Sequence, residues 1–151
     1  MSEDNPIRVF VAHNFHESDD YLRVFEFLES VERFFYLNVS KPENLPATGG
    51  MDAIKQELIN QIRECEAMIM PATFFLEKSD LARFELDAAG ANEKPIIAIR
   101  AFGGMIDMPK ELAGRAHETV EWNDREIVDA LKRQARLEDT SRWETIEFTL
   151  D

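Results

Sequence analysis

Five short apolar runs recur along the chain, separated by longer stretches that mix apolar and polar residues. Each run is rich in β-branched or other apolar residues and is too short for a typical helix. Such runs are typical of strands that are buried on both faces of a sheet. The predicted strands lie at 7–12, 34–40, 67–72, 94–101 and 117–122.

The stretches between these runs carry apolar residues three and four positions apart, which indicates helices with one buried face. The clearest helix covers 51–65, where Met51, Ile54, Leu58, Ile62 and Cys65 form one stripe. A first helix is predicted from Asp19 or Asp20, with Leu22, Phe25, Leu28 and Val31 as its apolar positions. The others are predicted over 79–93 with Ser79 as N-cap, in a short stretch from Pro109, and over 123–137 with Asn123 and Glu126 in a variant of the capping box.

Strands that alternate with helices pair in parallel through right-handed crossovers, with helices on both faces of the sheet. The predicted fold is therefore an α/β, flavodoxin-like three-layer sandwich with a five-stranded, mainly parallel sheet. It would form one domain over residues 1–136. The tail 137–151, in which Ile146, Phe148 and Leu150 alternate with polar residues, could add an edge strand, bind a partner, or be a loosely held terminus.

The chain is strongly acidic, with 30 Asp and Glu against 17 Lys and Arg and a net charge of −13. This field repels phosphate backbones, so we expect no nucleic-acid partner. No segment approaches the ~20 apolar residues that span a bilayer, and the start of the sequence does not resemble a leader. The single cysteine, Cys65, fits a reducing compartment, with burial favoured over catalysis. We therefore expect a cytoplasmic protein without a membrane partner.

The spacing of residues in the sequence excludes several well-known kinds of binding and catalytic site. The paired glycines at 49–50 and 103–104 match neither the P-loop nor the dinucleotide fingerprint. His13 and His16 share one loop, but no third residue stands at a recognisable metal-ligand spacing, so no metal is expected. That loop is either a solvated polar connection or a direct ligand contact. No serine or cysteine can be paired with a base from the sequence to form a triad.

Glu85 is the residue for which the sequence suggests a chemical role. In an open α/β sheet, ligands bind at the carboxyl ends of the strands, where the loops begin at His13, Lys41, Thr73 and Phe102. Helical spacing places Glu85 beside Leu81, Ala88 and Ala89, on a mostly apolar face near the start of its helix. A partly desolvated carboxylate there is suited to stabilising a positive centre. The alternative is a surface glutamate among alanines.

Four segments together resemble the TIR-like family of prokaryotic proteins, relatives of Toll/interleukin-1 receptor domains. They are "IRVFVAHN", "IKQELINQIRECEAMIMPAT", "SDLARFELDAAGANEKPIIAIRA" and "AHETVEWNDREIVDAL", and the similarity covers about residues 7 to 135. Ser79 and Glu85 hold the spacing of the family's serine and glutamate before a "KPII"-like strand. Leu81 stands where the family has a tryptophan, and Ala12 and His13 stand where a serine and an aromatic residue are common. These departures affect the expected identity of the substrate more than the expected fold.

The resemblance implies cleavage of the nicotinamide–ribose bond of NAD, which yields ADP-ribose or a cyclic or conjugated derivative. Glu85 would be the catalytic residue, with NAD as substrate and no bound cofactor. The substrate would be contacted by His13, Asn14, Phe15, Ser79 and Leu81. The loop 41–50 takes the place of the family's BB loop, so it implies self-association that completes a neighbour's site, although an ordinary connection explains it equally well.

A lone domain of this size resembles the components of bacterial anti-phage systems that make a nucleotide signal for a separate effector. Two other hypotheses stay open. The first is a non-catalytic TIR-like interaction module, which the leucine at position 81 favours. The second is a nucleoside deoxyribosyltransferase-like enzyme, which also has a glutamate before a "KPII"-like strand.

Overall fold

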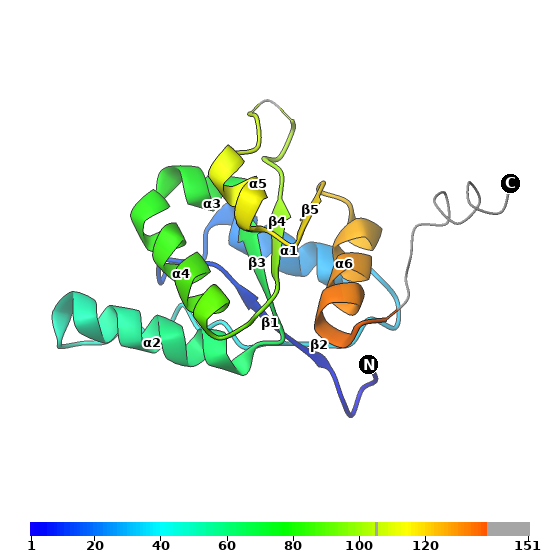
Figure 1. Cartoon of the computed structure of the whole chain (residues 1–151). Helices are drawn as coiled ribbons and strands as arrows, with labels where there is room; N and C mark the ends of the chain where they lie inside the picture. Colours follow the sequence, from blue (N-terminus) through cyan, green and yellow to red (C-terminus); the bar gives the residue numbers. More distant parts are fainter. Residues whose placement is uncertain (105, 139–151) are drawn as a thin grey trace, which may run out of the picture.

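The computed structural model describes residues 1–104 and 106–138 and has a central sheet with helices on either side (Figure 1). The proposed tail 137–151 thus falls almost entirely outside the described residues. Along the chain the elements are β1 (Ile7–Val11), α1 (Asp19–Glu29), β2 (Tyr36–Asn38), α2 (Gly50–Glu64), β3 (Ala67–Pro71), α3 (Ala72–Glu77), α4 (Ser79–Ala91), β4 (Ile96–Ile99), α5 (Lys110–Arg115), β5 (Glu118–Val120) and α6 (Asp124–Arg136).

The sheet has the order β2-β1-β3-β4-β5, and all four strand pairs are parallel. The flavodoxin-like prediction is confirmed. From β1 the chain first goes outward to β2 and then returns to β3 on the other side of β1. The direction of winding therefore changes between β1 and β3, which is where open α/β sheets bind ligands.

Alternation along the strands divides the core into two layers. Phe10, Met68 and Ile96 belong to the layer covered by α2, α3, α4 and α5, whereas Val11 and Ile69 belong to the layer covered by α1 and α6. Because neighbouring residues of a strand point to opposite faces, nearly continuous apolar runs are needed to fill both layers. This is why the runs identified the strands.

All five strands are shorter than their predicted runs, and three of them are shorter by more than one residue. The run 34–40 contains only Tyr36–Asn38 as strand, 94–101 contains Ile96–Ile99, and 117–122 contains Glu118–Val120. Among the strands that the structure describes, β2 and β5 form the edges of the sheet and have a partner on one side only. Some residues beyond the strand ends still bond to the neighbouring strand, as Val39 does to Val9 and Arg100 to Val120.

Helix α3 was not predicted, and its presence corrects the expected start of α4. The chain turns into a helix at Ala72, directly after β3, because Phe74 and Phe75 bury their rings in the core there. Only one residue, Lys78, separates α3 from α4. Lys78 therefore occupies the N-cap position of α4 and provides no side-chain cap, so the prediction that Ser79 is the N-cap is wrong.

The buried stripe of α1 also differs from the predicted one. The buried residues are Tyr21, Val24 and Leu28, whereas Leu22 faces outward. Leu28 is common to the predicted and the observed stripe, whereas Tyr21 and Val24 replace Leu22 and Phe25 on the buried face. At α6 the predicted cap is confirmed, because the side chain of Asn123 accepts a hydrogen bond from the Glu126 N–H at 2.9 Å.

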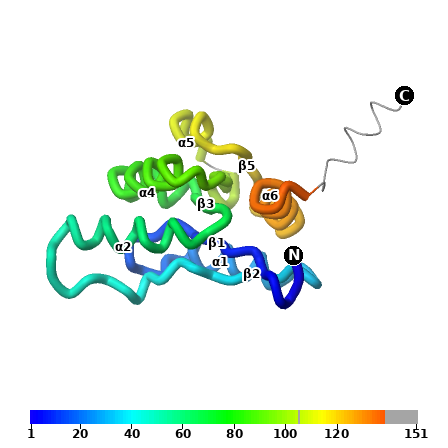
Figure 2. Tube along the Cα trace, turned by 60° about the horizontal axis from the view of Figure 1, so that its bottom comes forward, coloured from blue at the N-terminus to red at the C-terminus, as the bar shows by residue number. Residues whose placement is uncertain are grey.

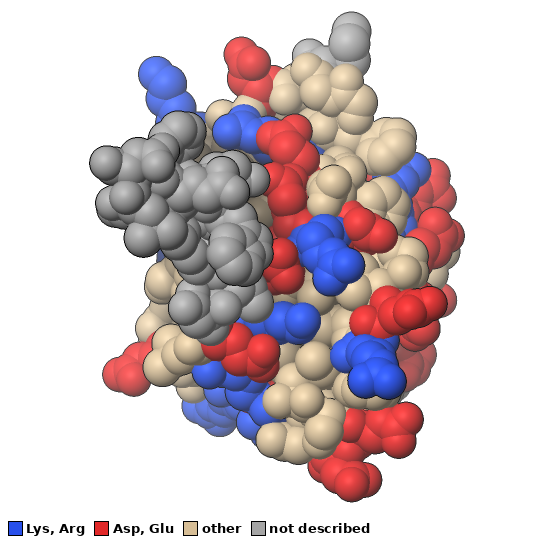
Figure 3. Space-filling view, turned by 90° about the vertical axis from the view of Figure 1, so that its right-hand side faces the viewer, with Lys and Arg blue, Asp and Glu red and all other residues tan. Residues whose placement is uncertain are grey.

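The N-terminal segment lies beside the end of α6 (Figure 2). There Arg136 donates to Glu66 at 2.9 Å and to the Pro6 carbonyl at 3.0 Å, and Arg8 also donates to Glu66. On the face that carries α6, acidic and basic side chains are interspersed (Figure 3). In the described part of the chain, no helix is both long enough and apolar enough to cross a membrane.

Candidate functional site

Glu85 lies on the face of α4 that packs against the sheet. Its neighbours on this face are Ala82, Leu86 and Ala89, all fully enclosed, and Glu85 itself has 0% of its surface exposed. The alanines allow α4 to approach the sheet closely, and the approach encloses the longer side chain between them. Glu85 is therefore not a surface residue, and its burial is more complete than the partial desolvation predicted from the sequence.

The two carboxyl oxygens of Glu85 differ in their contacts. Oε1 accepts a hydrogen bond from the backbone N–H of His13 at 3.2 Å. Oε2 is buried and, within residues 1–104 and 106–138, has no hydrogen-bond partner. Burial raises the pKa of Glu85 well above its ordinary value of 4.5, and the single N–H bond from His13 lowers it only in part. In this enclosed state the side chain thus favours its neutral form.

His13 lies two residues after the end of β1 and is 2% exposed. Its Nδ1 accepts from the backbone N–H of Phe15 at 2.9 Å, so the ring proton must lie on Nε2. Nε2 then donates to the Oε1 of Gln61 at 2.8 Å. Burial lowers the pKa of His13, although the bond to Gln61 opposes this effect. His13 is therefore a neutral imidazole with a defined tautomer.

Gln61 is the residue of this site that the sequence did not reveal. It is 3% exposed although it was assigned to the polar side of α2. Its amide group pairs with both backbone groups of Lys41, accepting from the N–H at 2.8 Å and donating to the carbonyl at 3.1 Å. Lys41 begins the loop 41–50. A glutamine inside an amphipathic pattern carries no sequence signal that distinguishes it from a solvent-facing one.

Phe15 adopts an unusual backbone conformation for a bulky residue. Its φ is +63°, in the left-handed region that glycine prefers. The bond from its N–H to His13 helps to hold this conformation, and the two rings meet edge to face with centroids 5.0 Å apart. Part of the Phe15 side chain also packs on the core layer under α2 and α4. The loop after β1 thus folds back over its own first residue.

A hollow of about 470 Å³ lies at the carboxyl edge, at the change of winding direction. One wall comes from the loop after β1 and the start of α1, including Asn14, His16 and Arg23, and the other comes from α3 and Lys78. Glu85 does not line it. Asn14 connects the two regions, because it lines the hollow and follows His13, whose N–H binds Glu85.

Two basic residues that line this hollow, Arg23 and Lys78, differ in their contacts. Arg23 donates to Asp20, which also accepts from Thr73, and the Arg23 guanidinium lies 4.1 Å from the centre of the Phe102 ring. This set of contacts joins α1, α3 and the loop that follows β4. Among the described residues Lys78 has no ion-pair partner within 4 Å, so it is the cation that remains available to an anionic ligand.

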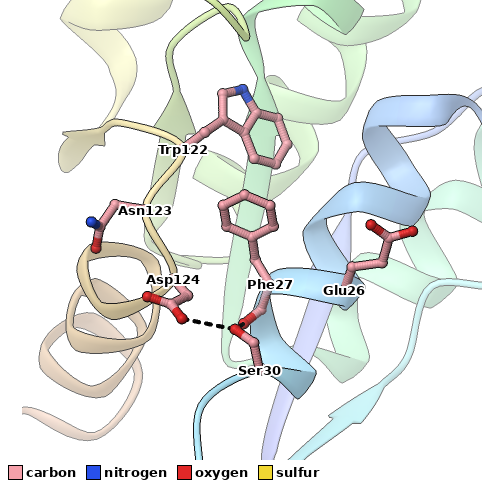
Figure 4. Close-up of a pocket in the computed structure, with 6 residues that line it drawn as sticks. All are labelled: Glu26, Phe27, Ser30, Trp122, Asn123 and Asp124. Carbon is pink, nitrogen blue, oxygen red and sulfur yellow. Dashed lines mark hydrogen bonds between the residues drawn. The ribbon is translucent and has the colours of Figure 1, made fainter.

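A second hollow, of about 370 Å³, lies between α1 and the start of α6 (Figure 4). The ring of Trp122 faces that of Phe27, and Ser30 donates to Asp124 at 2.8 Å. The charged residues of its lining, Glu26 and Asp124, are both acidic. It belongs to the layer of α1 and α6, on the opposite face of the sheet from Glu85, so we assign the candidate site to the first hollow and to Glu85.

The remaining predicted residues lie at the margin of this site. Ser79 is the first residue of α4, and Leu81 is partly buried against the same core layer as Phe15. The loop 41–50 follows β2 and is joined to His13 through Gln61. Within the described residues, no group of three or more His, Cys, Asp or Glu side chains could hold a metal ion.

Comparison of the chain with models of known protein families gives no match, and comparison with curated protein sequences gives none either.

Proposed function

We propose that this protein is a TIR-like enzyme that cleaves the nicotinamide–ribose bond of NAD, with Glu85 as the catalytic carboxylate. The observation that carries the proposal is a fully buried carboxyl group with one unpartnered oxygen at the carboxyl edge of the sheet. Structural ion pairs do not explain Glu85, and an unpaired buried carboxyl group lowers stability. Such groups occur most often where chemistry requires them.

In this reaction the bond between C1′ of the ribose and N1 of nicotinamide breaks, and its electron pair leaves with neutral nicotinamide. The ribosyl C1′ becomes positively charged, and an ionised Glu85 stabilises that charge. A hydroxyl group or water then attacks C1′ and loses a proton. Water gives ADP-ribose, whereas a hydroxyl group of the same molecule gives a cyclic derivative, which could act as a signal for a separate effector.

Glu85 has no exposed surface, so substrate can reach it only after the segment that begins at His13 moves. Moving this segment removes the His13 N–H bond but admits water and a cationic substrate, both of which favour the ionised carboxylate. The nucleotide phosphates would lie in the neighbouring hollow, where Lys78 supplies a positive charge beside the carboxylates of Asp19, Asp20 and Glu77.

We also propose that the loop 41–50 mediates self-association. Leu45 within it and Met51 directly after it expose more than half of their surface. Exposed apolar side chains on a loop beside the site are suited to a contact with a second copy of the chain. Turnover that rises faster than linearly with protein concentration would support this assembly.

The test is the release of nicotinamide from NAD by the purified protein at increasing protein concentrations. Glu85→Gln should abolish release, because it removes the charge at nearly constant size, whereas Asp80→Asn on the exposed side of the same helix should leave it unchanged. Loss of such an electrostatic contact lowers the rate about a hundredfold or more. Equal rates for the wild type and Glu85→Gln would contradict the assignment.

A second candidate is a non-catalytic interaction module, and the complete enclosure of Glu85 favours it. In that case NAD should not protect the protein against unfolding at any concentration. Self-association should still depend on Leu45 and Met51.

A further inference from the structure

The side-chain amide of Gln61 has all of its hydrogen-bonding capacity in use although it is buried. Its oxygen accepts from the His13 ring at 2.8 Å and from the Lys41 N–H at 2.8 Å. Its NH₂ group donates to the Lys41 carbonyl at 3.1 Å and to Glu57 at 2.9 Å. An amide has two acceptor positions and two donor protons, so no other side chain of this length can make all four bonds.

These bonds connect three separate parts of the site. Gln61 holds the first residue of the loop 41–50, and it also holds the ring of His13 at the end of β1. The backbone of His13 in turn binds Glu85 on α4. Because both ring nitrogens of His13 are engaged, one by Gln61 and one by Phe15, the residue is fixed at both ends of its ring.

We propose that Gln61 is a positioning residue: it fixes the His13 ring, and thereby the backbone N–H that binds Glu85, and it ties both to the start of the loop 41–50. A movement of this loop then changes the environment of Glu85 through a defined set of bonds. The structural part of this proposal is independent of the reaction, whereas its effect on turnover rests on the proposed function.

The structural test uses Gln61→Ala, with Gln56→Ala as the matched control. Gln56 lies on the same helix but is exposed and bonds only to Asn60. The nitrogen resonances of the His13 ring should show a proton on Nε2 alone in the wild type and in Gln56→Ala. In Gln61→Ala the Nε2 proton loses its acceptor, so this ring proton and the amide protons of Phe15 and Lys41 should exchange with solvent about tenfold faster or more.

Gln61→Glu serves as the second variant in case Gln61→Ala does not fold. The carboxylate still accepts from His13 and from the Lys41 N–H but cannot donate to the Lys41 carbonyl. It should therefore preserve the His13 tautomer while the exchange of the loop amides increases. Unchanged exchange of these protons in Gln61→Ala would overturn the proposal, as would exchange of the His13 ring proton in Gln61→Glu as fast as in Gln61→Ala.

If the wild type releases nicotinamide, Gln61→Ala should lower kcat by about tenfold to a hundredfold with little change in KM, because a misplaced catalytic group lowers the rate more than binding. The pH profile of kcat/KM, which reports the free enzyme, should also move to higher pH, since the His13 N–H bond lowers the pKa of Glu85 in that state. If the wild type releases none, the proposed function fails while the resonance and exchange measurements still decide the role of Gln61.

Discussion

The backbone N–H of His13 donates to Oε1 of Glu85 over 3.2 Å, although 72 residues separate them in the chain. This bond joins the end of β1 to the middle of α4 inside the core. It is the only bond that Glu85 makes with its carboxyl group among the described residues. Any displacement of the loop after β1 therefore acts directly on the one buried acid of this edge.

The first prediction concerns the stability cost of Glu85. Its pKa is raised in the folded state, so the folded protein holds the proton more tightly than the unfolded chain. The stability of the wild type relative to Glu85→Gln is therefore greatest below about pH 4.5 and decreases as the pH rises above that value. The decrease can reach about 1.4 kcal/mol per pH unit.

Urea unfolding at pH 5 and pH 8 measures this effect. The difference in the free energy of unfolding between Glu85→Gln and the wild type should grow in favour of the variant by about 1 kcal/mol or more. Asp80→Asn, on the same helix but exposed, should show no such change. A difference that stays constant between the two pH values would mean that Glu85 is already ionised in the fold.

The second prediction concerns Glu66, which behaves in the opposite way. Burial alone would raise its pKa, but hydrogen bonds from Arg136 and Arg8 outweigh burial and lower the pKa to about 2. Its contribution to stability is therefore complete above its ordinary value of 4.5 and is lost as the pH falls toward 2. Removing a hydrogen-bonded charge of this kind costs about 1.5–3 kcal/mol.

Glu66→Gln should consequently lower the free energy of unfolding at pH 7 and have little effect at pH 2. Glu64→Gln is the control, because Glu64 is exposed two residues earlier. Thermal unfolding of the three proteins over this pH range provides the comparison. Equal destabilisation at both pH values would show that the contribution comes from packing and not from charge.

The fold could be predicted because the spacing of apolar residues along the chain indicates which side chains are buried. Strands such as β3 are buried on both faces and have apolar residues at every position, and α6 carries a recognisable cap at Asn123. Helix α3 escaped prediction because six residues are too few for a periodic pattern, and its apolar residues continue the run of the preceding strand. Its existence depends on where Phe74 and Phe75 find space in the core.

A residue of the site could be predicted from the sequence only where its polarity differs from that of its neighbours on the helix. Glu85 stood out as an acid among alanines, and the structure buries it. Gln61 did not stand out, because a glutamine is ordinary on an amphipathic helix and only tertiary contacts with Lys41 and His13 explain its burial. The left-handed backbone of Phe15 gave no signal either, since this conformation is usual for glycine or asparagine and rare for phenylalanine.

The third prediction concerns Cys65, whose side chain is fully buried at the end of α2. Burial raises the pKa of its thiol to about 12, although Lys94 and Arg8 oppose the effect. The thiolate is the reactive form, so the native thiol should be inert at neutral pH. Labelling with a thiol reagent should proceed at the rate of unfolding and become fast in urea. Rapid, complete labelling of the native protein would contradict this.

The last prediction concerns the backbone strain at Phe15, where φ is +63°. Most residues lose about 1 kcal/mol or more in the left-handed region, whereas glycine loses little. Phe15→Ala and Phe15→Gly both remove the ring and its contacts, so the comparison between them isolates the backbone. Glycine should give the more stable protein by about 1 kcal/mol in urea unfolding, despite its greater freedom in the unfolded chain. At the helical position 56, glycine should instead be less stable than alanine by about 1 kcal/mol, because the backbone there is right-handed. If alanine is also the better residue at position 15, the loop after β1 does not hold the left-handed turn in solution, and the cover over Glu85 is formed in another way.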